Sequence, residues 1–231
     1  MLKLQKSPKQ HLIIFTRYPE AGKTKTRLIP ALGDIGAANL QKQMTEHTIL
    51  QVNKLQQTCA ITVEVRFTGG NGELMQNWFG LDFVYQTQGE GDLGERMIRS
   101  LADAFDNGAE DVIIIGTDCP GLNSQILTTA FEQLQCFDLV LGPALDGGYY
   151  LIGLRQLIPE LFSQIQWGTA QVFSQTVEIA QKINLSLVYL TTLADVDRPE
   201  DLPVWQQMRS TSAMEGYRVS KRKNLIFTTD Y

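Results

Sequence analysis

The first feature able to support chemistry is a basic, glycine-containing stretch, Thr16–Leu28, that directly follows a short apolar run. An eleven-residue span of this stretch contains four cations: Arg17, Lys23, Lys25 and Arg27. Gly22 lets the backbone approach a ligand closely. Backbone N–H groups in such a loop, with Lys and Arg around them, suit an anionic phosphate chain. A solvated basic loop is the alternative, but the position after a predicted buried strand favours phosphate binding.

The tripeptide Gly22-Lys23-Thr24 matches the end of the phosphate-binding P-loop motif, GxxxxGK[ST]. The first glycine of that motif would fall at position 17, which is Arg17. We therefore exclude a standard P-loop. Lys23 is then no longer the expected phosphate lysine, and Lys25 with Arg27 takes that role.

Two carboxylates follow other apolar runs. Asp118 comes just after Asp111–Gly116, and Asp146 lies in the turn Leu141–Tyr150. Carboxylates repel a polyphosphate unless a divalent cation bridges them, and Mg²⁺ commonly takes one or two carboxylates together with phosphate oxygens. We expect Mg²⁺ or Mn²⁺ here, held by Asp118 and Asp146, with Asp146 as metal ligand or general base. The alternatives are a helix-capping turn at Asp118 and a hairpin turn at Asp146.

Weaker signals surround these motifs. Gly147 and Gly148 would let a sugar or an acceptor lie against the backbone, and Tyr149 and Trp167 are further candidates for acceptor contacts. Arg96, in a glycine-rich turn that opens a helix, either reaches a phosphate or lies on the surface. Cys119 has no histidine near it in the sequence and is interpreted as a packing residue. Acidic and proline residues over 195–202 are explained by capping of the last helix.

These candidates must be positioned by alternating strands and helices. Apolar runs predict strands at His11–Thr16, Ala60–Phe67, Phe83–Gln86, Asp111–Gly116, Asp138–Gly142, Tyr149–Leu154 and Ser186–Leu190. Helix-like periodicity covers about Asp34–Gln56, with Asp34 as N-cap, and Leu93–Phe105, Asn123–Leu134 and Ala170–Lys182, with Thr169 as a possible N-cap. The alternation predicts an α/β fold with a mainly parallel sheet, and the short Gly147-Gly148 connection makes that sheet mixed. In open α/β sheets, ligands bind outside the carboxyl ends of the strands, where the candidates fall.

Length and composition are those of a globular protein. The chain has 231 residues, of which 43% are hydrophobic and 19% charged. We expect one domain over 1–231, with a core of about 11–209 and peripheral segments at 1–10 and 210–231; the basic patch Lys221–Lys223 is expected to be solvated. The net charge of −5 argues against sequence-independent binding of nucleic acid. No apolar run approaches the roughly 20 residues of a membrane span, no signal peptide is expected, and three scattered cysteines favour a reducing cytoplasm.

Five motifs, in order, resemble a bacterial family of GT-A-like transferases catalogued as a domain of unknown function (DUF2064). The family pattern runs K-x-P-x-x-G-x-x-K-T-R-L, G-D-L-G-x-R-M, G-x-D-x-P-x-L, D-G-G-Y-x-L-I-G and D-V-D-x-P-E-D-L. In this chain these are Arg17–Leu28, Gly91–Met97, Gly116–Leu122, Asp146–Gly153 and Asp195–Leu202. The match covers about residues 11–202. Arg17 departs from the usual Lys, Arg198 departs from the frequent Thr, and no Asp-x-Asp is present.

The resemblance implies a GT-A (nucleotide-diphospho-sugar transferase) fold. It also implies Asp118 as the metal ligand after the central strand, Asp146 as the second acid, and Lys25 and Arg27 at the phosphates. A more distant similarity is to the guanylyltransferase of coenzyme F420 synthesis. We expect metal-dependent glycosyl transfer from a nucleotide-sugar to an unidentified small-molecule acceptor. The alternatives are a nucleotidylyltransferase that uses a nucleoside triphosphate and releases pyrophosphate, and a non-catalytic nucleotide-binding protein.

Overall fold

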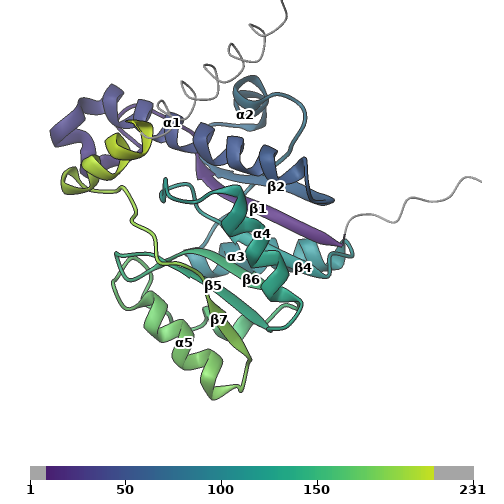
Figure 1. The fold of residues 1–231 in the computed structure, drawn as a ribbon. Helices are drawn as coiled ribbons and strands as arrows, with labels where there is room; N and C mark the ends of the chain where they lie inside the picture. The colour runs from purple at the N-terminus through teal and green to yellow at the C-terminus, as the bar shows by residue number, and fades with distance from the viewer. Residues whose placement is uncertain (1–8, 211–231) are drawn as a thin grey trace, which may run out of the picture.

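The computed structural model describes residues 9–210 and shows a mixed α/β fold (Figure 1). The strands are β1 (Gln10–Arg17), β2 (Ile61–Thr68), β3 (Val84–Thr87), β4 (Asp111–Ile115), β5 (Leu139–Pro143), β6 (Tyr149–Leu154) and β7 (Leu187–Tyr189). The helices are α1 (Ile29–Gln56), α2 (Gly72–Phe79), α3 (Leu93–Asp106), α4 (Ser124–Leu134), α5 (Val172–Lys182) and a last helix over 202–210. Short 3-10 turns lie at Thr26–Leu28, Pro159–Phe162 and Pro199–Asp201. The basic patch Lys221–Lys223 lies outside the described residues.

All seven strands belong to one sheet, in the order β3-β2-β1-β4-β6-β5-β7. The pairs β1–β2, β1–β4, β2–β3 and β5–β7 are parallel. Strand β6 runs antiparallel to both β4 and β5, which confirms the predicted mixed sheet. From β1, the chain builds outward to β2 and β3 and then returns to place β4 on the other side of β1. The strand order therefore reverses between β1 and β4, and such a switch point is where α/β sheets bind ligands. That the whole chain is a single domain stays a prediction.

Helices cover both faces of the sheet. On one face, α1, α2 and α4 pack against alternate residues of β1, β2 and β4. On the other face, α3, α5 and the turn Pro159–Phe162 pack against the residues in between. All five residues of β4 are buried, as expected for a central strand whose two faces are both apolar. A third apolar cluster joins the first half of α1 to Val196 and Trp205, and so ties the segment before the last helix to the rest of the fold.

Several predicted boundaries were wrong. Helix α1 begins at Ile29, with Pro30 in its first turn, and not at Asp34. Gly33 interrupts the helix with a non-helical backbone, φ 70° and ψ 169°. The helical conformation resumes at Asp34, so Asp34 is not the predicted N-cap. Thr169 is not an N-cap either, because α5 starts after Gln171.

Helix α2 was not predicted. It is only eight residues long, and it begins where the side chain of Asn71 accepts a hydrogen bond from the backbone N–H of Leu74. Within residues 9–210, no helix is long and apolar enough to cross a membrane.

Candidate active site

A cleft of about 890 Å³ lies along the carboxyl ends of the strands. Its lining comes mainly from the segments that follow β1, β3, β4 and β5, and from the segments before α5 and before the last helix. Of the predicted site residues, it contains Arg17, Lys25, Arg27, Asp118, Asp146, Gly148, Tyr149 and Trp167. The cleft is therefore centred where the topology predicts a ligand site, at the β1–β4 switch point.

Lys25 lies at the floor of this cleft with its side chain only 3% exposed. Its Nζ donates to the backbone oxygen of Val196 at 2.6 Å and to Oδ1 of Asp118 at 2.8 Å, and lies 3.6 Å from Oδ1 of Asp197. Lys25 also adopts a left-handed backbone conformation, φ 50° and ψ 45°. Strained residues of this kind concentrate at functional sites. The ammonium thus joins the loop after β1, the loop after β4 and the segment before the last helix.

Backbone hydrogen bonds fasten the acidic segments to one another. The N–H of Val196 donates to the carbonyl oxygen of Asp118 at 2.9 Å. The N–H of Leu145 donates to the carbonyl oxygen of Leu193 at 3.0 Å, next to a parallel bridge between Ala144 and Leu193. These bonds explain why the loop after β4, the β5–β6 turn and the segment 193–197 meet in one place, although they are far apart in the sequence.

The carboxylates of the cleft differ in their surroundings. The side chain of Asp118 is 53% exposed, so an oxygen is open to a ligand on the cleft side. Asp146 Oδ1 accepts a hydrogen bond from the N–H of Gly148 at 2.8 Å, so it does form the predicted turn while it lines the cleft. Burial, and then the charge of Asp146, raise the pKa of Asp195 above its usual value. Acidic groups are therefore close enough here to repel one another.

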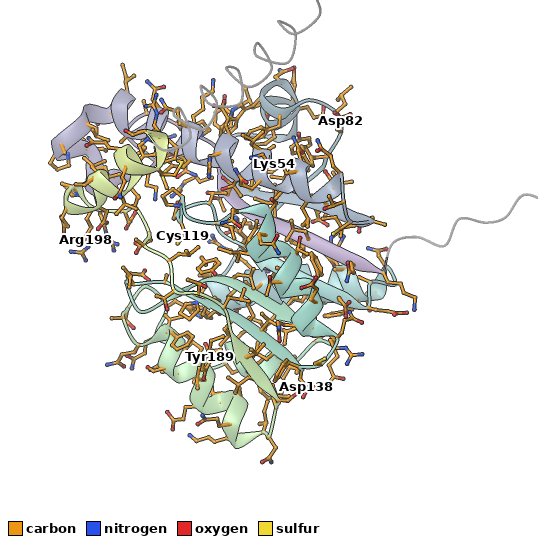
Figure 2. The ribbon with its side chains drawn as sticks, in the orientation of Figure 1. Lys54, Asp82, Cys119, Asp138, Tyr189 and Arg198 are labelled. Atoms are coloured by element: carbon orange, nitrogen blue, oxygen red, sulfur yellow. The ribbon has the colours of Figure 1, made fainter. Side chains whose placement is uncertain are left out.

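The more open cations of the cleft are arginines. Arg27 is 60% exposed and its Nη1 lies 2.6 Å from Oδ2 of Asp197. Arg17 and Arg198 also line the cleft, and Figure 2 shows Arg198 at the periphery of the molecule while Cys119 lies nearer its centre. Because Lys25 is enclosed by acceptors, the arginines are the groups most accessible to a phosphate chain.

A divalent metal fits this donor set through a small number of protein ligands. In residues 9–210, no group of three or more His, Cys, Asp or Glu side chains is positioned to hold a metal ion. Mg²⁺ bound with a nucleotide needs only one or two carboxylates, because phosphate oxygens and water complete its coordination. Asp118 and Asp146, both on the cleft wall, are chemically suited to that role.

A buried polar network forms the floor beneath these residues. Gln41 on α1 donates from Nε2 to the hydroxyls of Thr45 at 3.1 Å and Thr117 at 3.2 Å. The hydroxyls of Thr16 and Thr45 lie 3.0 Å apart. All four residues are nearly inaccessible to solvent. Since Thr16 is the second-last residue of β1 and Thr117 follows β4, the network fixes the starts of the two loops that carry the cations and Asp118.

Cys119 is buried beside Asp118. Burial raises the pKa of its thiol well above the usual value, and the charge of Asp118 adds to this effect. A thiol held neutral is a poor nucleophile. The structure therefore agrees with the interpretation of Cys119 as a packing residue.

Three predicted residues do not line the cleft: Gly22, Arg96 and Gly147. Arg96 donates from Nε to the backbone oxygen of Gly91 at 2.9 Å, at the start of α3. Gly147 has φ 88° and packs against the backbone of Ala170, so any side chain would collide there.

Trp167, which does line the cleft, packs on Gly94 at the start of α3. A Cβ at Gly94 would lie 2.9 Å from the Trp167 ring and 2.9 Å from the backbone oxygen of Phe162. Gly94 is thus required for the close approach of the indole. The rings of Tyr149 and Trp167 pack edge to face, with their centroids 6.5 Å apart, and form an aromatic wall on this side of the cleft.

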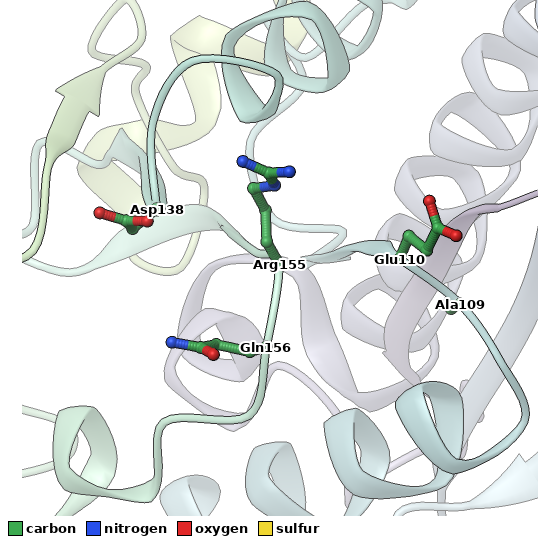
Figure 3. A pocket seen from close by; sticks show the side chains of 5 residues that line it. All are labelled: Ala109, Glu110, Asp138, Arg155 and Gln156. Atoms are coloured by element: carbon green, nitrogen blue, oxygen red, sulfur yellow. The ribbon is translucent and has the colours of Figure 1, made fainter.

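A second pocket, of about 430 Å³, lies at the opposite edge of the sheet (Figure 3). It is lined by Ala109, Glu110, Asp138, Arg155 and Gln156 and contains none of the predicted site residues. Asp138 is engaged by the hydroxyl and N–H of Ser186 at 2.6 and 3.0 Å. This edge carries the amino ends of β4 and β5, so it lacks the ligand-binding position of the fold.

Sequence reasoning missed several polar residues of the cleft, among them Asp197, Gln41 and Gln88. Asp197 was explained by capping, yet it contacts both Lys25 and Arg27. Gln41 and Gln88 carry no local motif, and only their place in the fold brings them to the floor. The signal available for Asp197 was its presence in one of the five motifs; nothing in the sequence points to either glutamine.

Comparisons with known proteins agree with this geometry. Residues 51–169 match a family described as an uncharacterized protein conserved in bacteria (DUF2064). A crystal structure of a presumed nucleotide-diphospho-sugar transferase from Desulfovibrio desulfuricans G20 is 33% identical, with a TM-score of 0.80 and 86% of each chain covered. A search of curated proteins found no match.

More distant structures share the fold alone. A CMP:2-keto-3-deoxy-manno-octonic acid synthetase in complex with CTP is 12% identical with a TM-score of 0.55, and 89% of this chain and 99% of that chain are covered. An inositol-1-phosphate CTP transferase from T. maritima is 13% identical with a TM-score of 0.55, and 89% and 96% are covered. Together with the sheet order and the five motifs, these matches show that the chain has the nucleotide-diphospho-sugar transferase fold and belongs to the DUF2064 family.

Proposed function

We propose that this protein is a metal-dependent transferase with a nucleotide-activated donor, and that it transfers a glycosyl group from a nucleotide-sugar. The observation that carries the proposal is the meeting of arginines, Lys25 and carboxylates at the β1–β4 switch point. Cations alone would suit any anion. Cations facing carboxylates suit a phosphate chain that arrives with a divalent metal.

In this proposal the phosphates of the donor lie over the ends of β1 and β4. Arg17 and Arg27 contact the phosphate oxygens, and Lys25 fixes Asp118 beneath them. Asp118 and Asp146 would hold Mg²⁺ or Mn²⁺, which supplies charge neutralisation for the leaving diphosphate. Preorganised cations of this kind stabilise charge that develops in the transition state.

The acceptor would enter from the side of Gly148, Tyr149 and Trp167. The acceptor oxygen forms a bond to the anomeric carbon while the bond from that carbon to the phosphate oxygen breaks, and the electron pair leaves with the diphosphate. The proton of the acceptor goes to a general base; Asp146 would fill either this role or that of second metal ligand beside Asp118, and not both. We favour direct displacement because the buried, neutral thiol of Cys119 is unsuited to act as a nucleophile.

The relative from Desulfovibrio desulfuricans supports glycosyl transfer, since it is described as a presumed nucleotide-diphospho-sugar transferase and covers 86% of this chain. A specific observation favours a second candidate, nucleotidylyl transfer. Several proteins of the same fold have names that specify CTP or a cytidylyl product. In that reaction the acceptor attacks the α-phosphorus of a nucleoside triphosphate, and pyrophosphate leaves.

Product analysis separates the two reactions. The protein is incubated with Mg²⁺ or Mn²⁺ and a panel of nucleotide-sugars and nucleoside triphosphates with candidate sugar and phosphate acceptors. Release of nucleoside diphosphate from a nucleotide-sugar supports glycosyl transfer, and release of pyrophosphate from a triphosphate supports the second candidate. Asp118→Asn should abolish metal-dependent turnover, whereas Asp138→Asn at the opposite edge should not. Metal-dependent binding without turnover of any donor would point to a non-catalytic nucleotide-binding protein.

A further inference from the structure

Gln88, the residue after β3, has its polar groups almost fully engaged. It is 6% exposed and lines the cleft. Its backbone N–H donates to Phe67 O at 3.0 Å, and its backbone oxygen accepts from Nη1 of Arg99 at 2.6 Å. Its side-chain Nε2 donates to the backbone oxygens of Thr16 and Arg66, each at 3.1 Å. Only the side-chain oxygen, Oε1, remains.

The two carbonyl oxygens fix which way the amide points. A primary amide has two N–H donors on one side and an acceptor on the other, and a flipped Gln88 would turn its oxygen toward Thr16 O and Arg66 O. Both N–H groups are therefore used, and Oε1 is a fixed acceptor. Within residues 9–210, no donor is bonded to it. Oε1 is not one of the solvent-inaccessible side-chain atoms that lack a partner, so it is open to the cleft, where a donor on a ligand can replace water.

The loop that carries Gln88 is itself rigidly held. Arg99 on α3 donates to the backbone oxygens of Gln88 and Glu90, at 2.6 and 3.0 Å. Gly89 has φ 78°, and a Cβ there would collide with the guanidinium of Arg99. The amide of Gln88 is thus presented to the cleft in one orientation, as recognition of a single hydrogen-bond pattern requires.

We propose that Oε1 of Gln88 accepts a hydrogen bond from an N–H group of the nucleotide base, and that Gln88 is a specificity-determining residue of the donor subsite. The proposal rests on the proposed function, because it takes a nucleotide to be the ligand. The side chain reaches from β3 across β2 to the end of β1, which adjoins the switch point. Neighbouring strands are about 4.8 Å apart, so a nucleotide with its phosphates over β1 and β4 can extend its base to this amide.

The surroundings of Gln88 favour the base over the ribose. Phe15 and Leu93 line the same cleft with apolar surface, which suits the faces of a flat ring. The hydroxyls of a ribose would need several polar partners when buried. An in-plane amide oxygen, in contrast, matches the edge of a base, where N–H donors lie in the ring plane.

A binding cycle tests the proposal. Dissociation constants are measured by calorimetry, with Mg²⁺, for the nucleoside diphosphates of the four common bases and for inorganic pyrophosphate. The tightest nucleotide is then compared with its analogue in which methyl groups replace the N–H hydrogens of the base. The proteins are the full chain, Gln88→Leu, and Gln86→Leu as a matched control on the exposed part of β3.

We expect base methylation to weaken binding to the full chain and to Gln86→Leu by about tenfold, and to have little effect on Gln88→Leu. Pyrophosphate should bind all three proteins equally, which a general structural defect in Gln88→Leu would not allow. Equal weakening by methylation in all proteins would overturn the proposal, as would a coupling of Gln88 to the 2′- or 3′-hydroxyl instead, measured with deoxy analogues. If the full chain binds no nucleotide at all, the proposed function fails and the base subsite with it.

Discussion

The contacts of Lys25 lead to a quantitative prediction for the substitution Lys25→Met. Methionine has an unbranched side chain of similar length, so the left-handed backbone conformation costs about as much with methionine as with lysine. It has no hydrogen-bond donor. The substitution removes the bonds from Nζ to Val196 O at 2.6 Å and to Asp118 Oδ1 at 2.8 Å. It also removes the charge that lies 3.6 Å from Asp197.

The three lost partners do not contribute equally to stability. Val196 is 0% exposed, so its carbonyl oxygen is left without a donor at a cost of about 1–3 kcal/mol. Asp118 and Asp197, with side chains 53% and 33% exposed, are rehydrated, so together they add at most about 1 kcal/mol. The ammonium no longer has to be buried, which offsets part of the loss. We expect a net destabilisation of about 1–3 kcal/mol, or a melting temperature lower by about 2–12 °C for a protein of this size.

Thermal unfolding followed by circular dichroism, without divalent metal, measures this effect. Lys23→Met is the matched control, because the side chain of Lys23 is 68% exposed and, in the part of the chain that the structure describes, pairs with Glu20 alone. Its free energy of unfolding should change by no more than about 0.5 kcal/mol. If Lys25→Met had the same melting temperature as Lys23→Met, Lys25 would not be the buried link between the loops, and the reasoning would be refuted.

Three further predictions concern packing, thiol chemistry and pH. Gly94→Ala should lower the free energy of unfolding, measured in urea, by about 1–3 kcal/mol, because the new Cβ would lie 2.9 Å from the indole of Trp167 and 2.9 Å from a carbonyl oxygen. Gly72→Ala is the control and should be nearly neutral, because no atom lies near the added Cβ. Equal effects of the two substitutions would contradict the packing argument. In the folded protein Cys119 should react with iodoacetamide far more slowly than the exposed Cys136, as peptide mass spectrometry would show; equal rates would contradict its burial and raised thiol pKa. Although burial opposes it, hydrogen bonds from neighbouring side chains lower the pKa of Glu64. The stability that Glu64 contributes is present above its unfolded pKa and is lost as the pH falls through its folded pKa. The loss of unfolding free energy caused by Glu64→Gln, measured in urea, should therefore shrink between about pH 7 and pH 3. A loss that stays the same over this pH range would be the contrary result.

The sheet could be predicted from the sequence because its strands are locally encoded. The run Val112–Ile115 is apolar on both faces, and the short turn before Tyr149 requires an antiparallel neighbour. Helix α2 and the start of α1 could not be predicted in this way. Tertiary packing determines a helix of eight residues, and the break at Gly33 depends on a backbone angle that no apolar pattern reports.

The site was predictable only in part for a similar reason. Asp118 and Asp146 follow strands, so their place at the carboxyl edge of the sheet could be predicted from the chain. The bond between Lys25 and Val196 joins residues 171 positions apart, and no spacing rule predicts it. Gln88 belongs to no motif at all, and its importance appears only once every hydrogen bond of its amide has been assigned.

The central claim is that a nucleotide lies with its phosphates over the β1–β4 switch point beside a metal held by Asp118. A crystal structure of the protein with Mn²⁺ and a nucleoside diphosphate, phased with the anomalous signal of manganese, tests it most directly. We predict an anomalous peak coordinated by the carboxylate of Asp118 and by phosphate oxygens, with Arg17 and Arg27 at the phosphates. A nucleotide bound elsewhere, for example in the pocket beside Asp138 and Arg155, or a metal without contact to Asp118, would contradict the claim.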